Sequence, residues 1–317
     1  MVSKSPVIND LIFRELIKRG YALEGNTRIW NIADSKLWYL TPKQAQAFLD
    51  LESSEDYQRD VIQKEIDLIN NNVDDILDEV REEALNIIDL GCGDGKKAVI
   101  FIEHLKGKLN TRYCPIDISG YMVEKAISKI KKLDAGEVVK FQWNISDFEN
   151  LENISSLLRS GDYKKNLLLL LGNTLGNFEI NELLYQIRGA MNEGDIILIG
   201  NGLDNRNEGD VLKSYQNEQL NNLLIHLPIN LGLKKAEVNY GVRFVNSRVE
   251  MYYTILRDKE IKFQDKRVVF HKGDQLLTAV SYKYQKDSFE DFLKMYFRDV
   301  KLFASEDDSY ALALCKK

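Results

Sequence analysis

Residues suited to ligand binding follow four successive predicted strands of this chain. Three glycines within residues 91–95 come directly after a short apolar run, and Asp117 ends the next predicted strand. Asp147-Phe148 follows the third strand, and a second glycine-containing segment, residues 172–178, follows the fourth. Glycine tolerates positive φ and lets a ligand approach the backbone, while a carboxylate accepts hydrogen bonds from hydroxyl or amine donors. Each feature is common alone, but their recurrence at consecutive strand ends predicts one binding site.

This layout is typical of a site for an adenosine-containing cofactor, either a nicotinamide dinucleotide or S-adenosylmethionine. Asp117 is placed to accept hydrogen bonds from ribose hydroxyls, and Asp147 to accept one from the adenine amine. A dinucleotide turn requires a small residue at its third conserved position, where this chain has Lys96. Asp89 and Asp94 would also place negative charge beside a pyrophosphate, whereas a zwitterionic aminoacyl sulfonium tolerates them. The residues therefore favour S-adenosylmethionine (SAM) as cofactor and S-adenosylhomocysteine as its product.

The elements that must position these residues alternate between strand and helix from about Leu85 to Gly202. Short, nearly unbroken apolar runs such as the five leucines 167–171 suit strands buried on both faces of a parallel sheet. Their alternation with amphipathic helices predicts right-handed βαβ units, and hence an α/β fold with a doubly wound, mostly parallel, Rossmann-like sheet. The predicted strands are 87–88, 113–118, 138–143, 165–171 and 195–200.

The flanking segments predict a second, α+β substrate domain. Residues 1–70 are rich in helix formers, except for an aromatic, irregular segment at 21–42, and we expect them to form the helical part of that domain. Residues 71–202 are the expected cofactor-binding core. Alternating apolar and polar residues within 203–285 predict antiparallel strands of the substrate domain, and 286–317 a helix and strand pair completing the core.

Composition and residue spacing argue against nucleic-acid, metal and membrane partners. The formal net charge of −6 argues weakly against nucleic acid as a partner. The three cysteines form no C-x-x-C pair and the three histidines do not cluster, so no metal motif is present in the sequence. No apolar run approaches the roughly 20 residues needed to cross a bilayer, and no signal peptide is recognisable, so we expect a cytoplasmic protein without a membrane partner.

The motifs also carry a family resemblance. Residues 89–95 (DLGCGDG) resemble the first motif of class I methyltransferases. Residues 115–119 (PIDIS) and 171–178 (LGNTLGNF) resemble the histidine-specific Nα-methyltransferases of ergothioneine biosynthesis, and so do residues 270–273 and 278–284 of the predicted substrate segment. The resemblance covers roughly residues 55 to 317. It implies a SAM-dependent methyltransferase that acts on the amine of a small amino-acid-like substrate.

Carried over by position, the resemblance implies a role for individual residues. Those expected to contact the cofactor are Gly91, Gly93, Lys97, Asp117, Asp147, Phe148 and Gly172. Those expected to bind the substrate are Gly172 and Asn177 at its amino and carboxylate end, Ser281 at its imidazole, and Tyr39 and Tyr57 as one wall. Asn177 and Tyr57 are the candidate catalytic residues, because they would orient the amine. Structural alternatives are a helix cap for Asn177, an ordinary strand position for Ser281 and core packing for the two tyrosines.

One position departs from the family pattern. The acidic residue that binds the imidazole stands two residues before the serine, and this chain has Ala279 there. Losing a hydrogen bond to a charged group typically removes about 1.5–3 kcal/mol of recognition. We therefore expect altered side-chain recognition. Alternatives are a SAM-binding protein without catalysis, or a methyltransferase that acts on protein or RNA.

Overall fold

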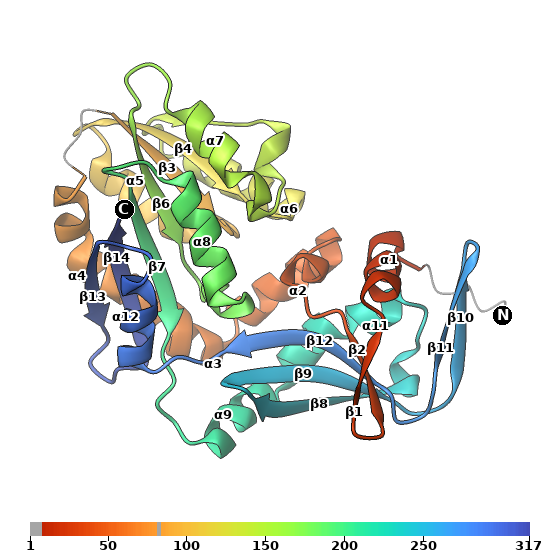
Figure 1. Cartoon of the computed structure of the whole chain (residues 1–317). Helices are drawn as coiled ribbons and strands as arrows, with labels where there is room; N and C mark the ends of the chain where they lie inside the picture. Colours follow the sequence, from red (N-terminus) through yellow and green to blue (C-terminus); the bar gives the residue numbers. More distant parts are fainter. Residues whose placement is uncertain (1–7, 81–83) are drawn as a thin grey trace. The chain divides into compact units, whose positions relative to one another are not determined.

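The computed structural model describes residues 8–80 and 84–317, apart from the side chains of residues 56, 60 and 143. The chain divides into two compact units (Figure 1). The first unit contains the chain up to Leu51 and Arg206–Tyr282, and the second contains Glu52–Asn205 and Lys283–Lys317. Each is described by itself below.

The second unit is built on a seven-stranded sheet of order β13-β14-β7-β6-β3-β4-β5. Strands β4 to β7 run parallel with β3, and β14 pairs antiparallel with both β7 and β13. The predicted doubly wound, mostly parallel sheet is therefore confirmed. Its strands are β3 (Ala84–Leu90), β4 (Asn110–Ile116), β5 (Glu137–Val138), β6 (Lys165–Leu170), β7 (Ile196–Gly202), β13 (Asp299–Ala304) and β14 (Tyr310–Lys316).

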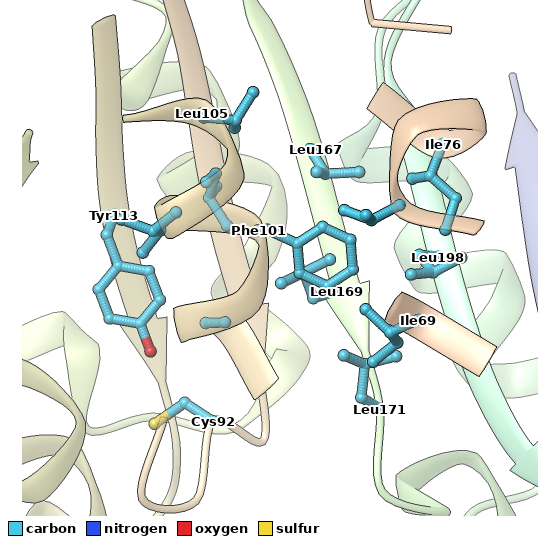
Figure 2. Packing of buried hydrophobic residues seen from close by; sticks show 14 of the residues in the cluster. Ile69, Ile76, Cys92, Phe101, Leu105, Tyr113, Leu167, Leu169, Leu171 and Leu198 are labelled. Carbon is cyan, nitrogen blue, oxygen red and sulfur yellow. The ribbon is translucent and has the colours of Figure 1, made fainter. Parts of the chain in front are cut away.

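Helices cover both faces of this sheet. Leu167, Leu169 and Leu198 point from the strands toward α4, α5 and α6, and Figure 2 shows the Phe101 ring of α5 packed among Leu169 and Ile69. The alternate residues, such as Leu168 and Ile197, are equally buried and face the opposite side, because successive strand side chains alternate. The α-helices of this unit are α3 (Glu55–Tyr57), α4 (Gln63–Asp78), α5 (Lys96–Leu105), α6 (Gly120–Lys131), α7 (Leu151–Leu158), α8 (Ile180–Ala190) and α12 (Lys286–Lys294), and a short π-helix, Gln58–Ile62, joins α3 to α4.

The third strand is much shorter than the predicted range 138–143, because an asparagine redirects the backbone. Asn144 is buried, and its Oδ1 accepts a hydrogen bond from the backbone N–H of Phe141. Its Nδ2 donates to the Pro115 carbonyl at 2.7 Å. These bonds compete with a strand ladder and turn residues 142–144 into a short 3-10 helix.

The first unit contains a five-stranded sheet of order β1-β2-β12-β9-β8 and a separate hairpin, β10-β11. The expectation that residues 21–42 are irregular was wrong in part. They contain a hairpin of β1 (Tyr21–Glu24) and β2 (Thr27–Asn31), and β2 pairs with β12. Elsewhere the expected antiparallel strands are present. They are β8 (Val238–Val245), β9 (Arg248–Ile255), β10 (Lys259–Phe263), β11 (Lys266–Phe270) and β12 (Gln275–Tyr282).

Helices pack against this smaller sheet around a second hydrophobic core. Ile12 and Leu16 of the first helix, together with Leu224 and Leu227, are buried in the same cluster as Tyr253 of β9. This unit therefore has a core of its own. Its helices are α1 (Asp10–Arg19), α2 (Pro42–Glu52, whose last residue belongs to the second unit), α9 (Glu208–Tyr215), α10 (Glu218–Leu224) and α11 (His226–Asn230).

Candidate active site

The glycine turn after β3 is anchored to the end of β4. The backbone N–H groups of Gly91 and Cys92 both donate to the Ile116 carbonyl, at 2.8 and 3.2 Å. Gly91, Gly93 and Gly95 all have positive φ, between +51° and +76°, which side chains with a Cβ rarely adopt. At Gly95 a Cβ would also lie 3.0 Å from Ala126 of α6. The glycines therefore permit both the turn and the close packing of α5 on α6.

Asp117 stands directly after β4 and is joined to that turn. Its Oδ2 accepts a hydrogen bond from the Gly93 N–H at 3.2 Å, and its Oδ1 accepts one from the Ser119 N–H at 2.9 Å. Burial raises the pKa of Asp117 to about 6, although these backbone donors favour the ionised form. A carboxylate held in this way retains lone pairs for hydroxyl donors.

A second carboxyl, that of Asp89, lies inside β3. It is 5% exposed and accepts a hydrogen bond from the Tyr113 hydroxyl at 2.8 Å. Burial raises its pKa to about 7, and the hydrogen bond from Tyr113 opposes that shift. Figure 2 shows Tyr113 on β4 and Cys92 in the glycine turn. Asp89 therefore links β3 to β4 near the glycine turn.

The segment after β5 lies beside Asp117. Ile145 forms an isolated bridge with Asp117, and the Ser146 N–H donates to the Asp117 carbonyl at 3.0 Å. Asp147 accepts from the Glu149 N–H and begins a short 3-10 helix, while the Phe148 ring packs on Phe178, with centroids 5.6 Å apart. The structure thus brings Asp147 and Phe148 to the edge that carries Asp117.

The loop after β6 carries Gly172 and Asn177. Gly172 has a φ of +74°, and Asn177 is the last residue of a 3-10 helix, Thr174–Asn177. The following helix α8 is capped by the side chain of Glu179, which accepts from the Glu182 N–H, so the helix-cap alternative for Asn177 is wrong. Among the residues that the structure describes, the half-buried Asn177 amide has no hydrogen-bond partner.

Lys97 contacts Glu65, a residue that the sequence analysis did not single out. Its Nζ lies 2.5 Å from the Oε2 of Glu65, which is fully buried on α4. The other oxygen, Oε1, accepts from the Gly172 N–H at 2.8 Å and from the Tyr310 hydroxyl at 2.7 Å. The spacing of the sequence could have indicated that Glu65 is buried. Glu65 stands at helical intervals from Leu68, Ile69 and Val73 and so lies on the apolar face of α4.

The substrate residues expected from the resemblance are divided between the units. Tyr57 ends α3 in the second unit, whereas Tyr39, Ala279 and Ser281 belong to the first. Within the first unit, the Trp38 indole donates to the Thr278 carbonyl at 3.0 Å, which places the segment containing Tyr39 beside β12. The hydroxyls of Ser281 and Tyr215 are 2.9 Å apart.

Two further observations concern residues 8–80 and 84–317. No three or more His, Cys, Asp or Glu side chains are grouped so that they could hold a metal ion. No helix there is both long and apolar enough to span a membrane.

The chemistry of this edge fits SAM. Beside Gly93 a Cβ would meet no atom within 4 Å, so a ligand can approach its backbone. Asp117 offers acceptors for hydroxyls, and Lys97 offers an ammonium for an anionic group. With the doubly wound sheet, these features fit the class of Rossmann-like SAM-dependent methyltransferases.

Comparison with known proteins places the chain within that class. Residues 45–317 match the family described as histidine-specific, SAM-dependent methyltransferases, and the chain belongs to this family. It is 22% identical over 266 residues to the N-methyltransferase fsqC of Aspergillus fumigatus, covering 78% of this chain and 70% of that protein. The protein is therefore a SAM-dependent N-methyltransferase.

Solved structures of similar fold include a SAM-dependent methyltransferase from Clostridium acetobutylicum, at 15% identity and a TM-score of 0.45, covering 86% of this chain and 98% of that one. Magnesium protoporphyrin IX methyltransferase from Synechocystis, with bound SAH, matches at 12% identity and a TM-score of 0.47, covering 90% of this chain and 100% of that one.

Proposed function

We propose that this enzyme methylates the amine of a small amino acid whose side chain is recognised without an acidic residue. The observation that carries the proposal is the Asn177 amide, which has no partner among the described residues and lies in the loop after β6. A carboxamide offers both an acceptor, for an ammonium or amine, and donors, for a carboxylate. It is therefore suited to the polar end that all α-amino acids share.

Cofactor binding is proposed to rest on the strand-end residues of the second unit. Asp117 would accept from the ribose hydroxyls, Asp147 from the adenine amine, and Phe148 would pack against the adenine. The backbone at Gly93 leaves room for close approach, because a Cβ there would meet no atom within 4 Å. Gly91 and Gly172 have the positive φ that the two loops require. Lys97 would pair with the carboxylate, the one anionic group of SAM. When bound, SAM supplies a methyl group on a sulfonium, which an amine lone pair can accept by in-line displacement.

The amine must be neutral when it reacts, so the protein must hold it and provide a route for its proton. Asn177 would orient the amine, and Tyr57 or water beside it would relay the proton from the ammonium to solvent, which leaves the amine neutral. Alignment of the lone pair with the methyl carbon can supply much of the rate enhancement. No metal ligand is required for these steps.

Side-chain selectivity is proposed to differ from that of histidine-binding relatives. Ala279 is 1% exposed and pairs with Met251 across β12 and β9, while Ser281 pairs with Val249 on the same face. Ala279, Met251 and Val249 all belong to one hydrophobic cluster, next to the hydroxyls of Ser281 and Tyr215. None of these neighbours offers a charge to a substrate side chain, so we propose that an uncharged, apolar or aromatic side chain with at most one polar group is favoured over an imidazolium.

Incubation with methyl-labelled SAM and a panel of free amino acids and simple amines tests the proposal. We expect label in an uncharged amino acid, with histidine a poorer substrate. Transfer only to protein or RNA would contradict the proposal, as would SAM binding without transfer to any small amine.

A further inference from the structure

Glu65 joins two of the strand-end loops from a distant part of the sequence. Its Oε2 contacts the Lys97 ammonium at the start of α5, directly after the glycine turn. Its Oε1 accepts the Gly172 N–H, at the start of the loop after β6. The Tyr310 hydroxyl of β14 also donates to Oε1, at 2.7 Å. One buried side chain thus fixes a cation and a backbone group at the carboxyl edge of β3 and β6, where open α/β sheets bind their ligands.

The Lys97 ammonium is left with bonding capacity at this place. An ammonium has three N–H donors, and within the described residues its polar contact is the Oε2 of Glu65. Gly172 lies so close that a Cβ there would be 2.6 Å from the Lys97 Nζ. The Lys97 ammonium therefore lies beside the backbone of Gly172, in the loop after β6, and keeps N–H donors for an anionic ligand.

A purely structural role explains this arrangement poorly. Buried ion pairs contribute little net stability, because the cost of removing both charges from water offsets their attraction. In the interior of the same unit, apolar residues fill the corresponding face of α4, including Ile69 and Val73. A charged pair at this edge is accordingly better explained by a requirement for a fixed cation.

The charges around Lys97 support the same conclusion. Burial by itself would lower the pKa of Lys97, but the negative charges of Glu65 and Glu52, followed by Asp89, raise it above its ordinary value. Glu52 also pairs with Lys96 at 3.0 Å, so Glu65 is the carboxylate that contacts Lys97 directly. Without Glu65, the buried ammonium would lose its closest counter-charge.

We infer that Glu65 is a positioning residue for cofactor binding, which holds the Lys97 ammonium charged and fixes it beside Gly172. This inference rests on the proposed contact between Lys97 and the cofactor carboxylate. Glu65 acts through Lys97, so its effect on affinity should depend on Lys97 being present.

The test measures SAM affinity by calorimetry in the full-length protein. Glu65→Gln keeps an oxygen acceptor for Gly172 and Tyr310 but removes the charge. We expect the dissociation constant for SAM to rise about tenfold at pH 7. It should rise more steeply toward pH 9 than the wild-type value does, because Lys97 loses its proton in the variant only. Titration of the cofactor's own α-amine, at about pH 8, affects both proteins alike. In a Lys97→Met background, Glu65→Gln should add less than about twofold.

Asp195 provides a matched control at the other edge of the sheet. It is fully buried, pairs with Arg159, and accepts from the N–H groups of Asn166 and Asn192 at 2.9 and 2.7 Å. Asp195→Asn should lower the melting temperature as Glu65→Gln does, but leave SAM affinity unchanged. If both variants weakened SAM binding equally, Glu65 would have only a general structural role and the inference would be overturned.

The double-mutant comparison distinguishes the role of Lys97 from that of Glu65. Unchanged affinity in Lys97→Met would remove the proposed Lys97 contact and the inference with it. Weak binding in Lys97→Met but wild-type affinity in Glu65→Gln at every pH would overturn the inference alone. If Glu65→Gln does not fold, Tyr310→Phe replaces it, because it removes one donor to Glu65 without changing charge. We then expect a loss of about two- to fivefold that also disappears in the Lys97→Met background.

Discussion

The backbone N–H of Gly93 donates a hydrogen bond to the Oδ2 of Asp117 at 3.2 Å, so the turn after β3 and the carboxylate after β4 hold each other in place. The bond orients Asp117 and leaves its oxygens with further acceptor capacity. Burial raises the pKa of the same carboxyl, so its charge changes within the range in which cofactor binding can be measured.

SAM affinity should fall as the pH falls through the pKa of Asp117. Because burial raises that pKa to about 6, the carboxyl is mostly ionised at pH 8 and mostly protonated at pH 5. Only the ionised form can accept from both ribose hydroxyls, so we expect about tenfold weaker SAM binding at pH 5 than at pH 8. Isothermal titration across this range is the measurement.

Asp117→Asn distinguishes Asp117 from its neighbour Asp89, whose pKa burial raises to about 7. The variant should bind SAM weakly throughout and lose the transition near pH 6. If that transition persisted in Asp117→Asn and vanished in Asp89→Asn, Asp89 would be the responsible group.

Gly95→Ala should destabilise the protein more than a comparable substitution elsewhere. Its φ of +76° costs an alanine about 1–2 kcal/mol, and the new Cβ would also lie 3.0 Å from Ala126. Gly107→Ala is the control, because its φ is +74° but a Cβ there meets nothing within 4 Å. Urea denaturation should show a clearly larger loss for Gly95→Ala. Equal losses would show that close packing of α5 on α6 adds nothing.

Asn177→Ala should weaken use of the amino acid far more than binding of the cofactor. Removing a hydrogen bond to a charged amine or carboxylate costs about 1.5–3 kcal/mol, which is roughly a tenfold or larger rise in KM. SAM affinity should stay within about twofold of the wild type. The exposed neighbour Asn181, which bonds Glu179 and Tyr296, gives the control variant Asn181→Ala. Equal loss of substrate and cofactor binding would argue against the role proposed for Asn177.

Ala279→Glu should shift selectivity toward histidine. The new carboxylate would replace the acidic partner of the imidazole that the family pattern has at this position, and we expect kcat/KM for histidine to rise about tenfold relative to other amino acids. Ala279→Gln matches the size without the charge and should give no such gain. Because Ala279 is 1% exposed, a melting curve and a SAM titration must first test whether both variants fold. A folded Ala279→Glu protein with unchanged selectivity would show that this position does not read the side chain.

The sequence by itself determined the fold class of this protein and which residues stand at the carboxyl edge of its sheet. Buried apolar runs and glycine turns are local patterns, and parallel strands then require residues such as Asp117 and Gly172 to stand at one edge of the sheet. The length of β5 could not be predicted in the same way. It depends on the side chain of Asn144, which bonds the Pro115 carbonyl of a neighbouring strand and so ends the ladder early.

Only the tertiary structure decided which groups Glu65 contacts. Helical spacing places it on a buried face, but its partners Lys97, Gly172 and Tyr310 come from three other parts of the chain. A carboxylate is buried only where such partners meet it, and their meeting depends on how α4 packs on the sheet rather than on any local pattern.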